Sequence, residues 1–113
     1  AIGSYQGVKH KLADMYVAAT LAKSNCYYAA WALSTDAAEL PLAAATARVS
    51  ATKAFDMCAS ENIQIHGGMG CTWEVDCHLY YRRARSLAVN IGSNLVWEEK
   101  LVRALETRPE EAA

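Results

Sequence analysis

Residues 62–74, NIQIHGGMGCTWE, combine polar side chains with three glycines in four positions. The amide of Gln64 and the ring of His66 can each donate and accept hydrogen bonds. The glycines expose backbone N–H groups that no side chain covers, which suits close approach by a phosphate, a ribose or another chain. A helix C-cap followed by a tight turn is the alternative, although one glycine supplies the positive φ that a cap needs. The three glycines are Gly67, Gly68 and Gly70.

Familiar nucleotide and metal motifs do not fit this stretch. Residues 68–70 give G-x-G, but Trp73 stands where a dinucleotide-binding fingerprint has its third glycine, and no strand is expected before it. A P-loop is excluded because no Gly-Lys-Ser/Thr follows. No metal site is expected either, since the C-x5-C-H spacing of the nearby cysteines and histidines matches no common zinc pattern. Those residues are His66, Cys71, Cys77 and His78.

The segments on either side of the glycines show the three-to-four-residue periodicity of amphipathic helices. Residues 34–36 (Ser-Thr-Asp) favour a turn, Pro41 suits the first turn of the following helix, and Ser93 can cap the last one. No segment shows sustained period-two alternation. We therefore expect an all-α fold, an antiparallel four-helix bundle in one domain of residues 1–113, with a frayed tail at 107–113. The expected helices are 4–33, 42–62, 74 or 75 to 89, and 94–106.

Charge and composition exclude several classes of partner. The 113-residue chain has a net charge of −1, from 11 basic and 12 acidic residues, which gives no reason to expect nucleic acid or an anionic membrane. No apolar run approaches the roughly 18 residues of a transmembrane helix, and nothing resembles a signal peptide. A cytoplasmic location is expected, with reduced thiols at the four cysteines. Because the chain starts without methionine and its helical pattern begins almost at once, we expect a piece of a longer protein.

The glycine stretch and the helix after it resemble the C-terminal helical domain of the acyl-CoA dehydrogenases. That family carries a Q-x-x-G-G-x-G-[aromatic]-[Thr or similar] loop and then a helix with Y-R-D-A-[KR], which correspond here to residues 64–72 and 80–85. Residues 2–15 match I-x-x-x-Q-x-x-x-x-x-L-A-D/E-M, so the resemblance spans nearly the whole chain in order and spacing. Arg83 stands where the family has Asp, so the ion pair of that Asp is not carried over. Glu74 or Asp76 represents the family's acidic residue after the loop.

The resemblance implies that the glycine stretch contacts FAD. In the family this loop meets the ADP end of an FAD that a neighbouring subunit mainly binds. Gln6 matches a second glutamine that contacts FAD, whereas Leu95 replaces a polar residue that often does so. Gly92 and Ser93 keep the family's glycine and hydroxyl, which implies a substrate contact at Gly92 and a flavin contact at Ser93. The FAD contacts carried over to this chain are Gln6, Gln64, Ile65, His66, Gly67, Gly68 and Ser93.

The family's catalytic base has no counterpart at its usual position. The base is a glutamate, commonly in a Tyr-Glu-Gly-Thr-Ser segment, which removes the α-proton of the acyl thioester. The aligned residues here are 90–94, NIGSN, and Ile91 takes the place of the glutamate. An isoleucine cannot accept a proton, so no catalytic residue is assigned in this chain. Three explanations stay open: a glutamate on an earlier helix before Ala1, a glutamate supplied by a different subunit, or a non-catalytic descendant.

The resemblance also implies the activity and the partners of the whole protein. We expect an FAD-dependent enzyme that oxidises an acyl-CoA to the trans-2-enoyl-CoA and passes electrons to an electron-transfer flavoprotein, as a homo- or hetero-oligomer. The piece alone is expected to be inactive. The alternative is a non-catalytic helical assembly module that shapes a partner subunit's flavin site. We expect Tyr27, Tyr28 and Trp31 to pack in the core or at a subunit interface, and the arginines of 82–85 to pair with carboxylates on a solvated face.

Overall fold

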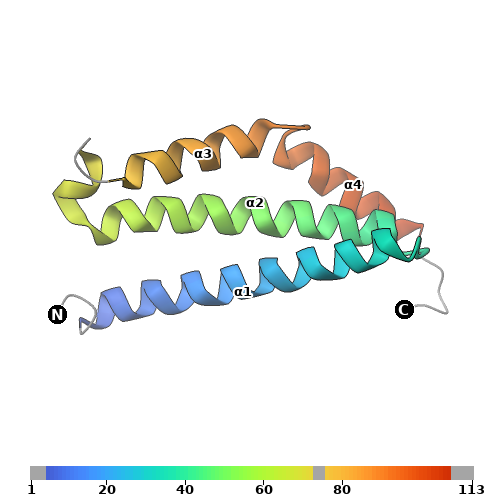
Figure 1. Cartoon of the computed structure of the whole chain (residues 1–113), viewed down its shortest axis with the longest axis horizontal. Helices are drawn as coiled ribbons and strands as arrows, with labels where there is room; N and C mark the ends of the chain where they lie inside the picture. The colour runs from blue at the N-terminus through green and yellow to red at the C-terminus, as the bar shows by residue number, and fades with distance from the viewer. Residues whose placement is uncertain (1–4, 73–75, 108–113) are drawn as a thin grey trace.

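The computed structural model describes residues 5–72 and 76–107, and these form helices joined by short connections (Figure 1). The α-helices are α1 (Gln6–Ser34), α2 (Leu40–Ile65), α3 (Cys77–Val89) and α4 (Asn94–Glu106), and a 3-10 helix, η2 (Gly67–Cys71), follows α2. The all-α, four-helix prediction is confirmed. The predicted tail lies outside the described residues apart from Thr107, which caps the C-terminus of α4.

The helix α2 is the centre of the molecule and contacts every other helix. The helix α1 runs antiparallel along one side of it, and α3 and α4 lie end to end along the other side (Figure 1). The two 13-residue helices together match the 26 residues of α2. The short turn between α3 and α4 bends the chain without reversing it (Figure 1). The helix α4 therefore runs along α2 in the same general direction as α3.

Most helix ends agree with the local signals in the sequence. The helix α1 ends at Ser34, before Asp36 with its φ of 51°, and α4 has the predicted bounds with Ser93 as its N-cap. Pro41 lies in the first turn of α2 as predicted, but α2 extends to Ile65, beyond the predicted end at residue 62. The predicted start of the third helix at residue 74 or 75 falls outside the described residues, and α3 is described from Cys77.

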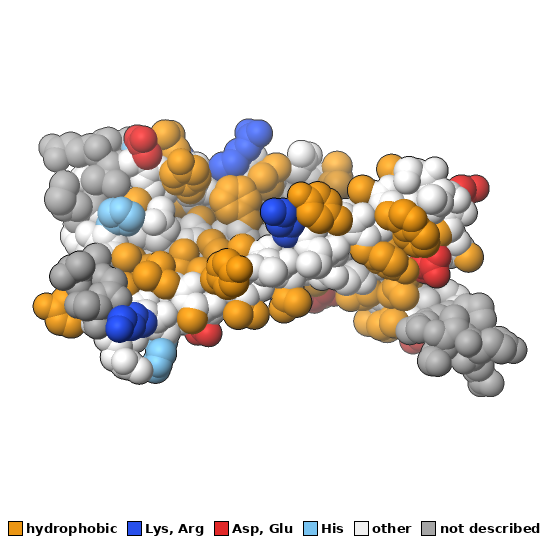
Figure 2. All heavy atoms as spheres, turned by 60° about the horizontal axis from the view of Figure 1, so that its bottom comes forward, with side chains coloured by type: hydrophobic (Ala, Val, Ile, Leu, Met, Phe, Trp, Pro, Cys, Tyr) orange, Lys and Arg blue, Asp and Glu red, His pale blue; other side chains and the backbone are white. Residues whose placement is uncertain are grey.

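Small side chains form the core. Among the described residues, the buried apolar side chains are seven alanines and one cysteine, which lets the helix axes approach closely. Large apolar side chains stay exposed instead, including Tyr16 (73%), Leu21 (59%) and Trp31 (51%) on α1. Figure 2 shows apolar side chains spread over the face on which α1 lies. The buried residues are Ala22, Ala32, Ala43, Ala45, Ala54, Ala59, Cys77 and Ala84.

The molecule is elongated, with extents of 51 × 28 × 23 Å. Its radius of gyration is 16.8 Å, above the roughly 13 Å expected of a compact domain of this length. A helix that is apolar on several faces is typical of the interior of a larger body. The shape and the exposed side chains of α1 therefore favour packing against more protein. None of the described helices is long and apolar enough to cross a membrane.

Candidate functional site

Two of the glycines after α2 are required by the fold itself. Gly67 has a φ of 64° and directly follows His66, whose backbone N–H closes the helix on the carbonyl of Asn62 at 3.2 Å. A glycine in the left-handed conformation, as Gly67 is here, commonly ends an α-helix. Gly70 is buried against α2, and a Cβ there would collide with the backbone carbonyl oxygen of Ile63. The helix-cap interpretation of the sequence therefore accounts for Gly67, and close packing accounts for Gly70.

Neither a positive φ nor close packing explains why residue 68 is a glycine. Its φ is not positive, the residue is exposed, and a Cβ added to it would meet no atom within 4 Å. A Cβ on Gly67 would also point into open space. The backbone at these two positions is thus an uncovered surface at the end of α2, next to the polar side chain of His66.

The ring of His66 is held by two residues from different helices. Its Nδ1 lies 2.8 Å from the carbonyl oxygen of Asn62 and 3.4 Å from Sγ of the buried Cys77, and the Asn62 amide donates to the same sulfur at 3.4 Å. A carbonyl oxygen can only accept, so Nδ1 carries the hydrogen, and in the neutral ring Nε2 is the acceptor. This arrangement fixes the orientation of the ring and fixes which nitrogen a ligand would meet.

The two glutamines predicted to contact FAD lie at the same end of the molecule. Gln64, in the last turn of α2, accepts a hydrogen bond through Oε1 from Lys11 of α1, which also pairs with Glu61 at 2.8 Å. Gln6, in the first turn of α1, shares a 2.9 Å hydrogen bond with His10. Ile65 is half-buried. The structure brings the predicted residues 64–68 together as one continuous surface and places Gln6 on the neighbouring helix (Figure 1).

Among the side chains that the structure describes, the cysteines and histidines near the glycines do not form a ligand set. Cys77 and His66 meet, but within the part of the chain that the structure describes no three His, Cys, Asp or Glu side chains lie close enough to hold a metal ion. Cys26, Cys58 and Cys77 are free thiols, as expected. In the basic segment of α3, Arg85 pairs with Asp56 at 3.4 Å and lies over the ring of Tyr81, so the expected pairing with a carboxylate is confirmed there.

The turn between α3 and α4 contains the other predicted residues. Ile91 has a φ of 56° and is 71% exposed, and Gly92 has a φ of 110°. A Cβ on Gly92 would lie 3.3 Å from Nε1 of Trp97, which donates a 3.0 Å hydrogen bond to the carbonyl oxygen of Ile91. Ser93 accepts a hydrogen bond from the backbone N–H of Val96 at 3.4 Å and so caps α4, as predicted.

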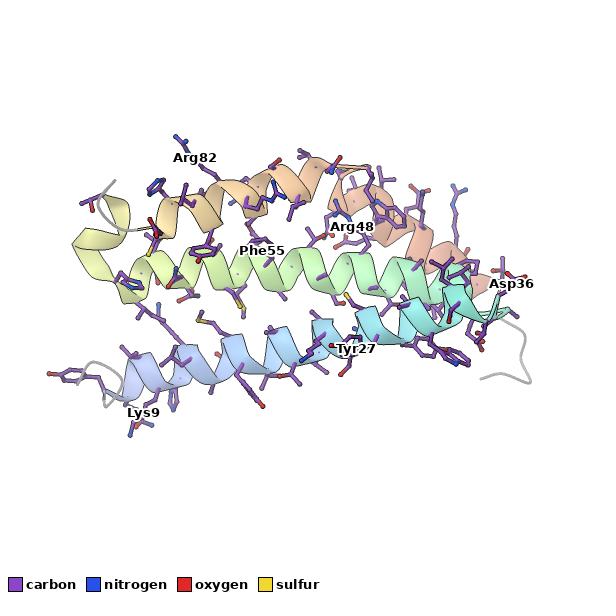
Figure 3. All side chains as sticks on the ribbon, in the orientation of Figure 1. Lys9, Tyr27, Asp36, Arg48, Phe55 and Arg82 are labelled. Atoms are coloured by element: carbon purple, nitrogen blue, oxygen red, sulfur yellow. The ribbon has the colours of Figure 1, made fainter. Side chains whose placement is uncertain are left out.

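The sequence analysis missed Arg48. This residue of α2 extends toward the α3–α4 turn (Figure 3), where its Nη2 donates to the carbonyl oxygens of Leu87 at 2.7 Å, Asn90 at 2.8 Å and Gly92 at 3.2 Å. The signal in the sequence was its isolation, because it is the one charged residue in the alanine-rich segment 40–52.

The structure does not bring the two groups of predicted residues together. The glycine segment lies at one end of α3 and the residues 91–93 lie at the other (Figure 1). Since α3 has 13 residues, the helix separates them by roughly 20 Å at about 1.5 Å per residue. One small ligand cannot contact both groups through short side chains. They form two separate surfaces of the same chain.

Comparisons with known proteins identify the family. The family model described as "Acyl-CoA dehydrogenase, C-terminal domain" matches residues 1–105. Acyl-CoA dehydrogenase IpdE2 of Mycobacterium tuberculosis is 44% identical over 108 residues, which cover 94% of this chain and 30% of that protein. Acyl-CoA dehydrogenase FadE34 of the same organism is 41% identical over 97 residues, which cover 85% of this chain and 14% of that protein.

More distant relatives agree with this assignment. The (R)-benzylsuccinyl-CoA dehydrogenase of Thauera aromatica is 26% identical over 107 residues, which cover 95% of this chain and 26% of that protein. The chain thus spans less than a third of the length of the curated relatives that it matches. No solved structure matches it. The chain belongs to the acyl-CoA dehydrogenase family and corresponds to its C-terminal helical domain.

Proposed function

We propose that residues 1–113 are the C-terminal domain of a longer, cytoplasmic, FAD-dependent acyl-CoA dehydrogenase, and that the surface at residues 64–68 contacts the ADP half of an FAD held mainly by a neighbouring subunit. The observation that carries this proposal is Gly68, a glycine that neither its φ nor packing within the chain requires. A missing Cβ with open space around it is the expected form of a backbone that a ligand approaches closely. The neighbouring side chains of Gln64 and His66 supply hydrogen-bonding groups suited to ribose and phosphate oxygens.

The geometry of His66 supports the same contact. Because Asn62 and Cys77 hold its Nδ1, Nε2 is the nitrogen available to hydrogen-bond a hydroxyl of the cofactor. Lys11, which is paired with Glu61, also donates a hydrogen bond to Oε1 of Gln64 and so holds the orientation of that amide. Bound FAD would accept the hydride of the substrate. The residues of this chain would orient the FAD and exclude water from it.

The turn at residues 91–93 belongs, in this proposal, to a second flavin site. Gly92 and Ser93 take the positions that contact substrate and flavin in the family, and they lie about 20 Å from the glycine surface along α3. One chain would therefore take part in two neighbouring FAD sites. Ile91 cannot remove a proton, so we propose that the catalytic glutamate comes from a different subunit of a hetero-oligomer. The other two explanations for the missing base are a glutamate elsewhere in the same polypeptide and a loss of catalysis.

The outward side of α1 supports an oligomer. Tyr16, Tyr27 and Trp31 are each at least half exposed although they are aromatic, and Tyr28 stacks on Trp31 with ring centroids 5.7 Å apart. Aromatic side chains on a surface are typical of subunit interfaces. We propose that this side of α1 packs against another part of the oligomer. Acyl-CoA and an electron-transfer flavoprotein would be further partners of the complete enzyme.

The absence of a proton acceptor at Ile91 also favours the alternative function, a non-catalytic assembly module. The two functions are separated by purifying the full-length protein alone and together with any co-encoded homologue. A catalytic complex would be yellow and would reduce a dye with acyl-CoA, and substitution of the partner's glutamate would abolish turnover while FAD stays bound. Turnover by the full-length chain alone would exclude the two-subunit proposal. A colourless complex without turnover would exclude both the enzyme and the FAD contact.

A further inference from the structure

The carbonyl groups at the end of α3 are bound by side chains from outside that helix. The last carbonyls of an α-helix have no partner within it, and here the carbonyl oxygens of Leu87 and of the C-cap residue Asn90 accept hydrogen bonds from Nη2 of Arg48 at 2.7 and 2.8 Å. The same nitrogen lies 3.2 Å from the carbonyl oxygen of Gly92. A guanidinium at this end also opposes the partial negative charge of the helix dipole.

Three consecutive carbonyls of the turn are fixed in this way. Arg48 of α2 binds those of Asn90 and Gly92, and Trp97 of α4 binds the carbonyl between them, that of Ile91, at 3.0 Å. The turn is therefore held from two sides, by Arg48, which lies about forty residues before it in the sequence, and by Trp97, six residues after Ile91. Figure 3 shows Arg48 between α2 and the junction of α3 and α4.

The turn that these side chains hold contains strained backbone. Ile91 is β-branched and has a φ of 56°, a region that such residues rarely enter because their Cβ then lies too close to the following carbonyl oxygen. Strained backbone of this kind persists where the surroundings hold it, and it concentrates at functional sites. Arg48 is itself costly to place, since among the described residues its buried Nε finds no acceptor. A loop of ordinary residues could join α3 to α4 without either cost.

We propose that Arg48 is a positioning residue for the flavin site at the α3–α4 turn, because it fixes the backbone from which Gly92 and Ser93 face the flavin. This inference rests on the proposed function. Ser93 directly follows the last fixed carbonyl, so its Cα moves whenever the turn moves. The planar guanidinium, which carries several donors in a fixed geometry, suits this role better than an ammonium group.

The experiment uses the intact flavoprotein with its partner subunit and compares Arg48→Met with Arg48→Lys. We expect Arg48→Met to raise the FAD dissociation constant about tenfold, the size of one hydrogen-bonded contact, and to change the visible spectrum and the reduction potential of the flavin that remains bound. Arg48→Lys should restore part of the affinity and the spectrum. Lys53→Met is the matched control, since Lys53 joins α2 to Glu98 of α4 at 2.8 Å and does not touch the turn. It should leave the three flavin properties unchanged.

A second variant keeps the inference testable if Arg48→Met does not fold. Trp97→Phe keeps a ring but removes the hydrogen bond to Ile91, and it should change the spectrum and the potential in the same direction. The inference is overturned if these variants lower only the melting temperature and leave the flavin properties as in the wild type. A wild-type complex that binds no FAD instead overturns the proposed function, and the inference with it.

Discussion

The Sγ atom of Cys77 lies 3.4 Å from Nδ1 of His66 and the same distance from the side-chain nitrogen of Asn62. One buried thiol therefore connects the start of α3 with the end of α2 and with the residue that precedes the glycines. The contact explains how a short segment with little side-chain bulk keeps a defined position. It also makes the stability of this end of the molecule depend on a residue outside the glycine segment.

Replacement of Cys77 by alanine should therefore be destabilising. It leaves the Asn62 amide without its sulfur acceptor and opens a small cavity, so we expect the free energy of unfolding of the intact protein to fall by about 1–2 kcal/mol. Denaturant titration measures the change. Cys26→Ala, at an exposed cysteine of α1, is the control and should stay within about 0.5 kcal/mol of the wild type. Equal effects of the two substitutions would show that the buried contact contributes nothing.

Ile91→Asn should stabilise the protein. Asparagine enters the left-handed region more readily than a β-branched residue, so we expect a gain of roughly 1 kcal/mol in unfolding free energy. Val89→Asn is a matched control, because Val89 is also β-branched and also 71% exposed but lies in the last turn of α3. Valine and asparagine have similar helix propensities, so this variant should be close to neutral. The strain assigned to Ile91 is contradicted if both variants shift stability equally.

The helices could be predicted from the sequence because their signals are local. Pro41 and Ser93 occupy the positions that their backbone and side-chain chemistry favour, and the segment 34–36 ends α1 as expected. The end of α2 was placed too early because nothing between Asn62 and Ile65 is incompatible with a helix. Gly67, with its positive φ, is the residue that terminates it.

The site could be predicted only where a motif marks it. The FAD contact expected of residues 64–68 stays a prediction. That Gly70 is needed for close packing depends on the backbone of Ile63, which no spacing rule reveals. The direction of α4 depends on a positive φ at Ile91. Isoleucine rarely adopts a positive φ, so the residue type does not predict this turn. The contacts of Arg48 could not be predicted from the sequence, because its three partners are backbone carbonyls about forty residues away in the chain.

The thiols should differ in reactivity with pH. Burial raises the pKa of the Cys58 thiol, which also lies 3.8 Å from the carbonyl oxygen of Met15. A raised pKa means that less of the reactive thiolate is present at any pH below it, so alkylation of Cys58 by iodoacetamide should begin at a higher pH than for an ordinary thiol. Mass spectrometry of the native protein across a pH series measures this. Modification of Cys58 at the rate of the denatured chain at every pH would contradict the expectation.

Substitutions of Gly67 and Gly70 should lower the stability of the protein. Gly67→Ala forces a Cβ into a positive-φ position, which costs about 1 kcal/mol, and Gly70→Ala meets the backbone of Ile63 and should cost more. Thermal melting of the intact protein checks both changes. Melting temperatures equal to the wild type would mean that this segment is held less tightly than its contacts indicate.

Gly68→Ala tests the FAD contact most directly, because a Cβ at this position meets no atom of the chain. The measurement is the FAD dissociation constant of the intact protein with its partner subunit, taken together with the melting temperature of the FAD-free form. We predict an unchanged melting temperature and a dissociation constant raised about tenfold, since the methyl group occupies space that the cofactor needs. An unchanged dissociation constant would contradict the account, because Gly68 would then be exposed to solvent rather than to a coenzyme.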